Sequence, residues 1–273
     1  AEATAGKRRE FQFLKSGTTG VANTASSLWG VGSQPAAGAV ASAAPGGRVP
    51  NDTTTGTFPF TNPNSGDTQH FVSGYPLASV AGNTLLLYDR LFDVVKTASS
   101  SATEAVSGTP SRYQSITDTD PDSAIGNFLF IEQFSALASV AHNWTVCTYT
   151  DQNGNTGATL PSITGSATGL INRLDMPTYS WFCPLAAGDT GIKNLTQMQC
   201  SSASITGNAN FVIGHPLVWM PCPIASLVCV VDGINSAFNL TRIFDDACLA
   251  FLEVVKPSTS ATTYTGSFTT VAG

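Results

Sequence analysis

The chain has 273 residues, of which 42% are hydrophobic and only 11% are charged, and it carries a net charge of −6. Soluble domains usually contain about 25% charged residues, so most of the polar surface must come from Ser, Thr, Asn, Gln and Gly, which suits strands and turns better than helices. No run approaches the roughly 18 apolar residues that cross a bilayer, so the sequence predicts no membrane partner.

The first 66 residues are rich in Gly, Ala, Ser, Thr and Pro and show almost no regular hydrophobic pattern. Such a stretch cannot bury enough apolar area to fold by itself. We therefore expect residues 1–66 to form an extended N-terminal arm that is ordered by a neighbouring molecule, and residues 67–273 to form the folded body.

The charges of this arm differ from those of the body. The first 50 residues hold five basic and two acidic side chains, whereas the rest of the chain holds seven and sixteen. We predict that the arm binds a partner protein through basic side chains that face acidic patches and through one isolated aromatic anchor, namely Lys7, Arg8, Arg9, Lys15 and Trp29. Only three of these cations are clustered, which is too few to predict nucleic-acid binding.

Candidate strands start near residue 70 and are separated by turn residues at short intervals. They are HFVSGYPLASV (70–80), TLLLYDRLFDVVK (84–96), FLFI (128–131), YSWFCPL (179–185), IKNLTQMQC (192–200), NFVIGHPLVWM (210–220), SLVCVVDGI (226–234), CLAFLEVV (248–255) and TYTGSF (263–268). The segment 84–96 could instead be a helix, and EQFSALASVAHNW (132–144) fits a helix or a bulged strand. Because short strands with turn signals are typical of a β-sandwich or jelly roll, we predict a mainly β fold with an antiparallel sandwich-like body.

The clearest hairpin is NWTVCTYTDQNGNTGATL, residues 143–160. Asn153-Gly154 is a strong turn dipeptide, and residues 156–160 would form the return strand. Alternation places Trp144, Val146, Thr148 and Thr150 on one face of the first strand, and Asn143, Thr145, Cys147 and Tyr149 on the other.

Residues 97–127 form a long segment without an evident core, which we interpret as a contact surface. It contains Asp118, Asp120 and Asp122, whose spacing resembles the start of an EF-hand loop. Ser123 then stands at the required glycine position and Leu129 at the bidentate Glu position. The pattern therefore favours a solvated acidic turn over a Ca²⁺ site.

No motif of catalysis or cofactor binding is complete. The three histidines are far apart, no G-x-S-x-G elbow marks a nucleophile, and no glycine-rich nucleotide loop follows a strand. The six cysteines show no C-x-x-C spacing, so we interpret them as small buried hydrophobes of a protein made in a reducing compartment. His215 is expected to be a hydrogen-bonded core residue, and Trp144, Trp181 and Trp219 to pack in the core. The sequence thus predicts no catalytic residue, no cofactor and no metal.

Five sequence elements resemble a group of tailed-bacteriophage virion structural proteins: GTFPFTNPNSGDTQHFVSG, LLLYDRLFDVVKT, SRYQS, YTDQNGNTGATLP and GDTGIKNLTQMQCSSA. In that group an arm precedes a strand with an L-Y-D-R-L element and then a Y-T-N-Q-x-G hairpin. Tyr88 to Leu91 and Tyr149 to Gln152 match, while Asp151 departs from the expected Asn. The resemblance covers most of residues 55–255, carries no catalytic residues and implies a location in the virion.

Together these features predict a non-enzymatic virion structural protein, assembled in the host cytoplasm, that decorates and stabilises the capsid by bridging neighbouring shell subunits. Its partners would be the major capsid protein or other virion proteins, and self-association into a homo-oligomer such as a trimer would fit. The alternatives are a different virion component (capsid shell, tail tube or neck), a glycan-binding module for host attachment, and a hydrolase with a dispersed site around His215.

Overall fold

Three antiparallel β-sheets make up the protein, and no helix occurs in the residues that the structure describes. The computed structural model describes residues 7–17, 19–97, 101–166, 169–202, 206–234, 240–255 and 259–273. The predicted mainly β, antiparallel, sandwich-like fold is therefore confirmed. No helix long and apolar enough to cross a membrane is found in these ranges.

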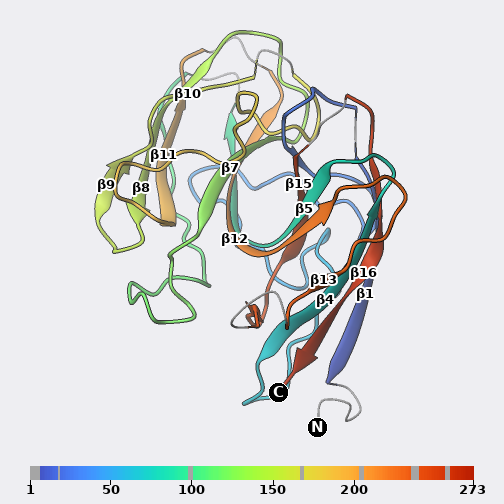
Figure 1. Ribbon diagram of the computed structural model, residues 1–273. Helices are drawn as coiled ribbons and strands as arrows, with labels where there is room; N and C mark the ends of the chain where they lie inside the picture. Colours follow the sequence, from blue (N-terminus) through green and yellow to red (C-terminus); the bar gives the residue numbers. More distant parts are fainter. Residues whose placement is uncertain are drawn as a thin grey trace.

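Each sheet collects strands from distant parts of the chain (Figure 1). Sheet A contains β1 (Arg8–Ser16), β3 (Ser33–Gln34), β4 (Gln69–Ala78), β13 (Val231–Asp232), β14 (Arg242–Ile243) and β16 (Thr263–Ala272). Sheet B contains β2 (Ser26–Ser27), β5 (Asn83–Thr97), β7 (Phe128–Gln133), β12 (Asn208–Cys222) and β15 (Leu249–Val255). Sheet C contains β6 (Glu104–Ala105), β8 (Asn143–Asp151), β9 (Thr156–Thr159), β10 (Ile163–Thr164) and β11 (Ile192–Cys200).

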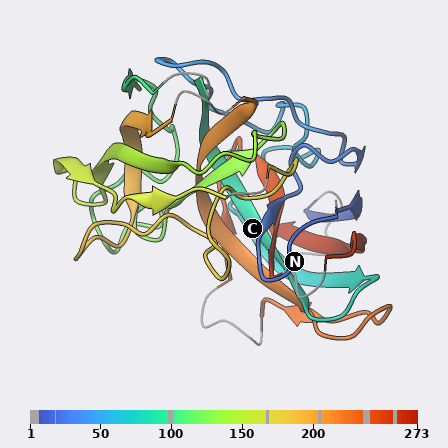
Figure 2. The same cartoon turned by 90° about the horizontal axis from the view of Figure 1, so that it is seen from above.

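Sheet B is the middle layer, and β5 is buried on both of its faces. Leu85 and Leu87 pack in the core that sheet B shares with sheet A. Leu86 and Tyr88 point the other way, into the larger core shared with sheet C. Figure 2 shows β5 and β12 between the strands of the other two sheets. A strand buried on both faces needs apolar residues in succession, which explains why the sequence of this strand is also compatible with a helix.

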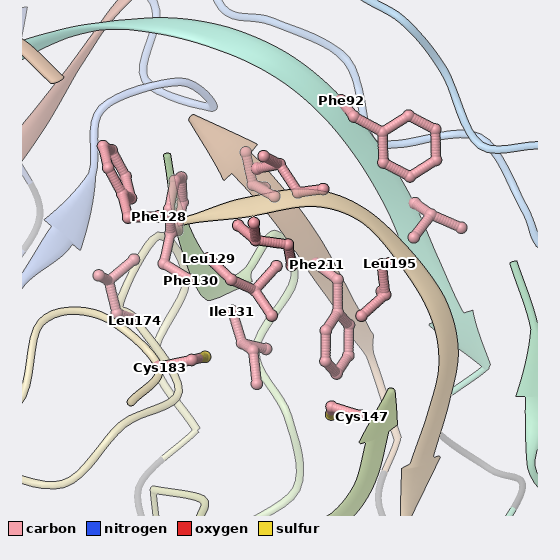
Figure 3. Close-up of a cluster of buried hydrophobic side chains, with 14 of the residues drawn as sticks. Phe92, Phe128, Leu129, Phe130, Ile131, Cys147, Leu174, Cys183, Leu195 and Phe211 are labelled. Atoms are coloured by element: carbon pink, nitrogen blue, oxygen red, sulfur yellow. The ribbon is translucent and has the colours of Figure 1, made fainter. Parts of the chain in front are cut away.

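The larger core surrounds β7 and the facing strands of sheet C. Leu129, Phe130 and Ile131 are fully buried in it. Figure 3 shows Phe211 of β12 near Leu195 and Cys147, which come from sheet C. Five of the six cysteines are buried free thiols, at positions 147, 183, 200, 222 and 248, and Cys229 is partly exposed. The prediction of buried cysteines is confirmed for these five.

The hairpin of sheet C forms at the predicted residues, with Gly154 in the left-handed region at φ +85°. The predicted division of faces is wrong for Trp144, which is buried in the same core as Cys147 and Tyr149. Opposite Gln199 and Cys200 of β11, the register skips Thr145, so a β-bulge occurs there. An extra residue in one strand turns the following side chains to the other face.

The first 66 residues are not a separate extended arm in the part that the structure describes. β1 pairs with β16 over all nine of its residues. Phe58 lies between sheets A and B, with ring centroids 5.1 Å from Phe251 and 5.0 Å from Phe268. The segment therefore buries its apolar side chains against strands from the other end of the chain. The alternation of Phe11 and Phe13, both buried, is the local signal that could have identified β1.

Most of the other predicted strands form near their predicted positions, and a few do not. The segments 70–80, 84–96, 192–200, 210–220 and 248–255 coincide closely with β4, β5, β11, β12 and β15. No strand forms at 179–185, and only Val231–Asp232 is paired as a strand within 226–234. Residues 135–142 form irregular structure, so neither the predicted helix nor the predicted bulged strand is found there.

Candidate interaction surfaces

An exposed run of large aliphatic side chains lies along the outer side of β4, and we call it the apolar edge. Its members, with their exposed fractions, are Ile224 (57%), Leu227 (55%), Val228 (50%), Val230 (63%) and Ile234 (59%). Contiguous apolar surface of this kind marks a binding surface when it occurs on a soluble protein. The sequence predicted a strand here but not its exposure.

Backbone hydrogen bonds fix the apolar edge against β4. Cys229 N–H donates to the carbonyl of Pro76 at 3.0 Å, and Gly233 N–H donates to that of Val72 at 2.7 Å. Between them Val231 stands opposite Gly74 in the β13–β4 register. The segment thus continues sheet A outward, and Val231 packs onto the core between sheets A and B.

A groove of about 820 Å³ lies beside β1 on the opposite side of the sheet, and we call it the β1 groove. It is lined by Arg9, Glu10, Phe11, Gln12, residues 33–36, Thr57 and Pro59. β3 pairs with β1 only at Leu14 and Lys15, so in the described part of the chain no strand occupies the groove side of Arg8 to Phe13.

The backbone of β1 offers hydrogen-bonding groups to this groove. The carbonyl of Lys7 accepts a hydrogen bond from Ala272 N–H at 2.9 Å, and Gly17 N–H donates to Thr262 at 2.7 Å. Because pairing alternates along an antiparallel strand, the odd-numbered residues of β1 bond to β16. The N–H and C=O groups of Glu10 and Gln12 therefore point into the groove.

A pair of exposed tryptophans forms a third surface feature. Trp181 and Trp219 are 37% and 43% exposed, and their ring centroids are 6.4 Å apart at an interplanar angle of 52°. Tyr179 is 77% exposed. The expectation that these two tryptophans pack in the core is wrong, whereas Trp144 is buried as predicted.

Among the predicted partner-binding cations, three are accessible to different degrees. Lys7 is half-buried and donates to Asp67 at 3.1 Å. Arg8 is exposed, with its guanidinium 3.8 Å from Glu10. Arg9 is half-buried and lines the β1 groove. Their predicted contact with a partner stays a prediction.

Lys15 and Trp29 cannot contact a partner as predicted, because both are buried. The Lys15 Nζ atom donates to the carbonyls of Val31 at 2.7 Å and Pro35 at 2.8 Å, and burial lowers its pKa to about 8. The side chain of Trp29 is 1% exposed, and its Nε1–H donates to the Ala39 carbonyl at 2.9 Å. Trp29 does fill a pocket, but the pocket belongs to its own chain.

A buried ionic network holds the N-terminal segment to sheet B. Arg90 of β5 donates to Asp93 Oδ2 at 2.7 Å and to Glu132 Oε1 at 2.7 Å, and all three side chains are at most 1% exposed. Arg48 donates to both carboxylate oxygens of Asp93, to Oδ2 at 2.6 Å and to Oδ1 at 3.0 Å. Burial alone would raise the pKa of Glu132, but the charge and hydrogen bonds of Arg90 bring it below its ordinary value.

Asp89, which precedes Arg90 in β5, anchors the long segment 97–127. Asp89 accepts two hydrogen bonds from the Arg112 guanidinium, both at 2.8 Å, and one from Cys248 N–H at 2.9 Å. Arg112 also donates to the Pro50 carbonyl at 3.1 Å. Tyr88, Asp89 and Arg90, which carry the resemblance noted above, thus form structural contacts inside the protein.

In the acidic turn of that segment, the carboxylates of Asp120 and Asp122 accept hydrogen bonds from backbone N–H groups. Asp120 accepts the N–H of Asp122 at 2.9 Å, and Asp122 accepts that of Tyr113. The hydrogen bond from Asp122 N–H, together with one from the Ser115 side chain, lowers the pKa of Asp120. Among the residues that the structure describes, no three His, Cys, Asp or Glu side chains are arranged to hold a metal ion.

His215 is partly buried and hydrogen-bonded, in agreement with its predicted packing role. Its ring stacks on Tyr113 at a centroid distance of 3.8 Å, and its Nδ1 lies 2.8 Å from Asn127 Oδ1. Asn127 donates its amide hydrogens to two carbonyls, so its oxygen faces the ring and His215 Nδ1–H is the donor. Burial lowers the pKa of His215 to about 4.

Comparison with known proteins identifies no relative of this chain, because no family model, no curated protein and no solved structure matches it.

Proposed function

We propose that this chain is a non-enzymatic structural protein of a tailed-bacteriophage particle, which decorates the capsid and stabilises it by bridging neighbouring shell subunits. The observation that carries the proposal is that sheet A offers a binding edge on each of its two sides, the apolar edge beside β4 and the β1 groove beside β1. A protein that bridges two neighbours needs two separate contact surfaces. The sequence resemblance to virion structural proteins supports the same role.

The mechanism is mechanical and requires no catalytic group. Contacts that exist only in the assembled shell stabilise assembly over separation by mass action. Many copies on one lattice add the effect of multivalency. The buried ion pairs around Arg90 and Asp89 suit this role, because they fix the N-terminal segment and the segment 97–127 to one rigid body.

The β1 groove is suited to an extended segment of a shell subunit. Adding a strand to an open sheet edge uses backbone hydrogen bonds for affinity, and Glu10 and Gln12 offer such groups on the groove side. The predicted tether role of an N-terminal arm is replaced by this edge, since β1 itself belongs to sheet A.

The proposal is tested with particles assembled without this chain, to which the purified protein is added. Bound protein should raise the temperature at which the particles release their DNA. Gln12→Pro removes the N–H that points into the groove and should lose particle binding, whereas the matched variant Gln12→Ala keeps that N–H and should bind normally. Circular dichroism confirms that both variants fold. Native particles that contain none of this chain by mass spectrometry would overturn the proposal.

The exposed tryptophan pair favours a second candidate function, glycan binding for host attachment. Aromatic faces stack on sugar rings, and Trp181 and Trp219 present two such rings within 6.4 Å. A glycan array should then show a ligand whose binding is lost in Trp219→Ala. Tyr75→Ala, which removes another exposed aromatic (41%) on sheet A, is the control that should keep binding. An array without any ligand speaks against this candidate.

A further inference from the structure

In the part of the chain that the structure describes, the apolar edge pairs with a strand on one side of its backbone only. The N–H groups of Cys229 and Gly233 point toward β4. Because the direction of these groups alternates along an extended chain, those of Val228 and Val230 point away from β4. No other strand in the described ranges pairs with this segment, since β13 is the terminal strand of sheet A (Figure 1).

This edge lacks the protection that natural sheet edges usually have. Charged side chains, prolines or covering loops keep exposed edges from pairing with other chains. Leu227 to Val231 contains no charged residue, and three of its side chains are at least half exposed. Short apolar, β-branched segments of this type associate readily with each other.

The order of residues around Cys229 makes the edge complementary to itself. In an antiparallel two-fold pairing centred on Cys229, Val228 stands opposite Val230 of the second copy, and Leu227 stands opposite Val231. Asp232 then lies beyond the last apolar pair, at the end of the contact where the extended segment gives way to the turn at Ser226. A centre at Val230 would instead place the Asp232 carboxylate against Val228, where its burial would be unfavourable.

We propose that the apolar edge binds the same edge of a second copy of this chain, in an antiparallel two-fold dimer centred on Cys229. The dimer joins the two copies of sheet A into one continuous sheet, with Val228 and Val230 supplying the backbone hydrogen bonds between the copies. It also presents two β1 grooves, one on each outer side. This inference deepens the proposed function, on which it rests, by naming the partner of one of the two surfaces.

The pairing makes a specific prediction about Cys229. As the centre of the two-fold, it forms a non-hydrogen-bonded pair with its counterpart, with the Cα atoms about 4.5 Å apart. Disulfides form at Cα separations of roughly 4.4–6.8 Å. The other five cysteines are buried, so mild oxidation with diamide should link two chains through Cys229.

The test uses the purified full chain and light scattering coupled to size exclusion. Wild type should have twice the monomer mass of 28.3 kDa. Val230→Asp should be monomeric, because two carboxylates would enter the contact. Ile116→Asp replaces an aliphatic residue of similar exposure (57%, against 63% for Val230) outside the apolar edge and should remain dimeric. Circular dichroism shows whether each variant is folded. A monomeric wild type, or a dimeric Val230→Asp variant, overturns the proposal.

Cross-linking tests the register within a dimer. Peptide mapping of the oxidised wild-type dimer should find the linkage between the two copies of Cys229. In the double variant Val228→Cys, Cys229→Ser the introduced thiols stand opposite Val230, so a linkage between them should not form. A dimer in which the thiols introduced at position 228 become linked, while the native Cys229 thiols do not, overturns the proposed centre. Because purified protein is measured without particles, failure of the dimer is distinguishable from failure to bind a capsid.

Discussion

The guanidinium of Arg90 lies over the indole ring of Trp29, with its Cζ atom 4.6 Å from the ring centroid. Both side chains are at most 1% exposed. A cation held against an aromatic face in a buried site is a favourable contact of about 2 kcal/mol. This single contact joins the middle strand of sheet B to a segment whose sequence shows no pattern of a folded element.

Arg90→Met should destabilise the protein by about 3–5 kcal/mol, because Glu132 would lose the cation that compensates its burial, and Asp93 would keep only Arg48. The measurement is urea unfolding at neutral pH. Arg8→Met is the matched control, since its contact with Glu10 is exposed and 3.8 Å long, and it should change the free energy of unfolding by less than about 0.5 kcal/mol. Equal effects of the two substitutions would contradict the assigned role of the network.

Gly38→Ala tests whether the N-terminal segment packs around Trp29 as the structure shows. A Cβ atom at position 38 would lie 2.0 Å from Cε2 of Trp29, and the indole is enclosed. We expect a loss of stability of about 1–3 kcal/mol, as for other overpacked cores. Gly46→Ala, where a Cβ meets nothing within 4 Å, should be neutral. Thermal unfolding of both variants gives the comparison, and a neutral Gly38→Ala would contradict the packing.

Strands with apolar residues in succession could be predicted from the sequence, but the choice of layer could not. The predicted segment CLAFLEVV contains β15, because its run of apolar residues is visible within the strand itself. The ambiguity of the segment 84–96 is resolved only by the two cores, since Leu85 faces one and Leu86 the other. Local periodicity does not reveal which layers will cover a strand.

The fold of the N-terminal segment could not be predicted because its contacts are distant in sequence. Phe58 packs against Phe251 and Phe268, and Trp29 against Arg90. The sequence around each aromatic is rich in Gly, Ser, Thr and Pro and has no regular apolar period, so a local pattern indicates an arm that cannot fold. The cations Arg8 and Lys15 are close together in the sequence. Because side chains alternate between the two faces of β1, Lys15 is buried and Arg8 is exposed.

The candidate surfaces were only partly predictable. The sequence identified SLVCVVDGI as apolar and strand-like but gave no reason to place it at the end of a sheet. The exposure of Trp219 follows from its position in β12, where Val218 and Met220 on either side are buried. Edges and exposed aromatics depend on which strands remain without a neighbour, and this is a property of the whole fold.

Arg112→Gln should release the segment 97–127 from the body. The substitution removes the two hydrogen bonds to Asp89 and leaves a buried carboxylate with one remaining partner, Cys248 N–H. We expect proteinase K to cut between residues 106 and 123 at least several times faster than in wild type. Cleavage sites are mapped by mass spectrometry. An unchanged rate would show that other contacts hold the segment.

The pair formed by His142 and Asp175 should make stability depend on pH. His142 Nε2 lies 2.8 Å from Asp175 Oδ2, and Nδ1 lies 2.7 Å from the Val140 carbonyl. Asp175 also accepts hydrogen bonds from Gln133 and Trp144, as expected of an ionised carboxylate. Both ring nitrogens therefore donate, which requires the imidazolium. Burial alone would lower the pKa of His142, but Asp175 raises it above the ordinary 6.5.

As the pH rises, the unfolded state loses the imidazolium proton of His142 before the folded state does. The stabilisation by His142 is therefore complete below pH 6.5. It is lost as the pH rises through the folded-state pKa. His142→Gln should therefore cost about 3–5 kcal/mol near pH 6 and less at alkaline pH, as measured by urea unfolding.

His215 is the internal control. With a folded-state pKa of about 4, its contribution should be present above pH 6.5 and fall as the pH decreases toward that pKa. NMR titration of both imidazoles measures the two values directly, and a pKa of His142 at or below that of a free histidine would contradict the ion pair.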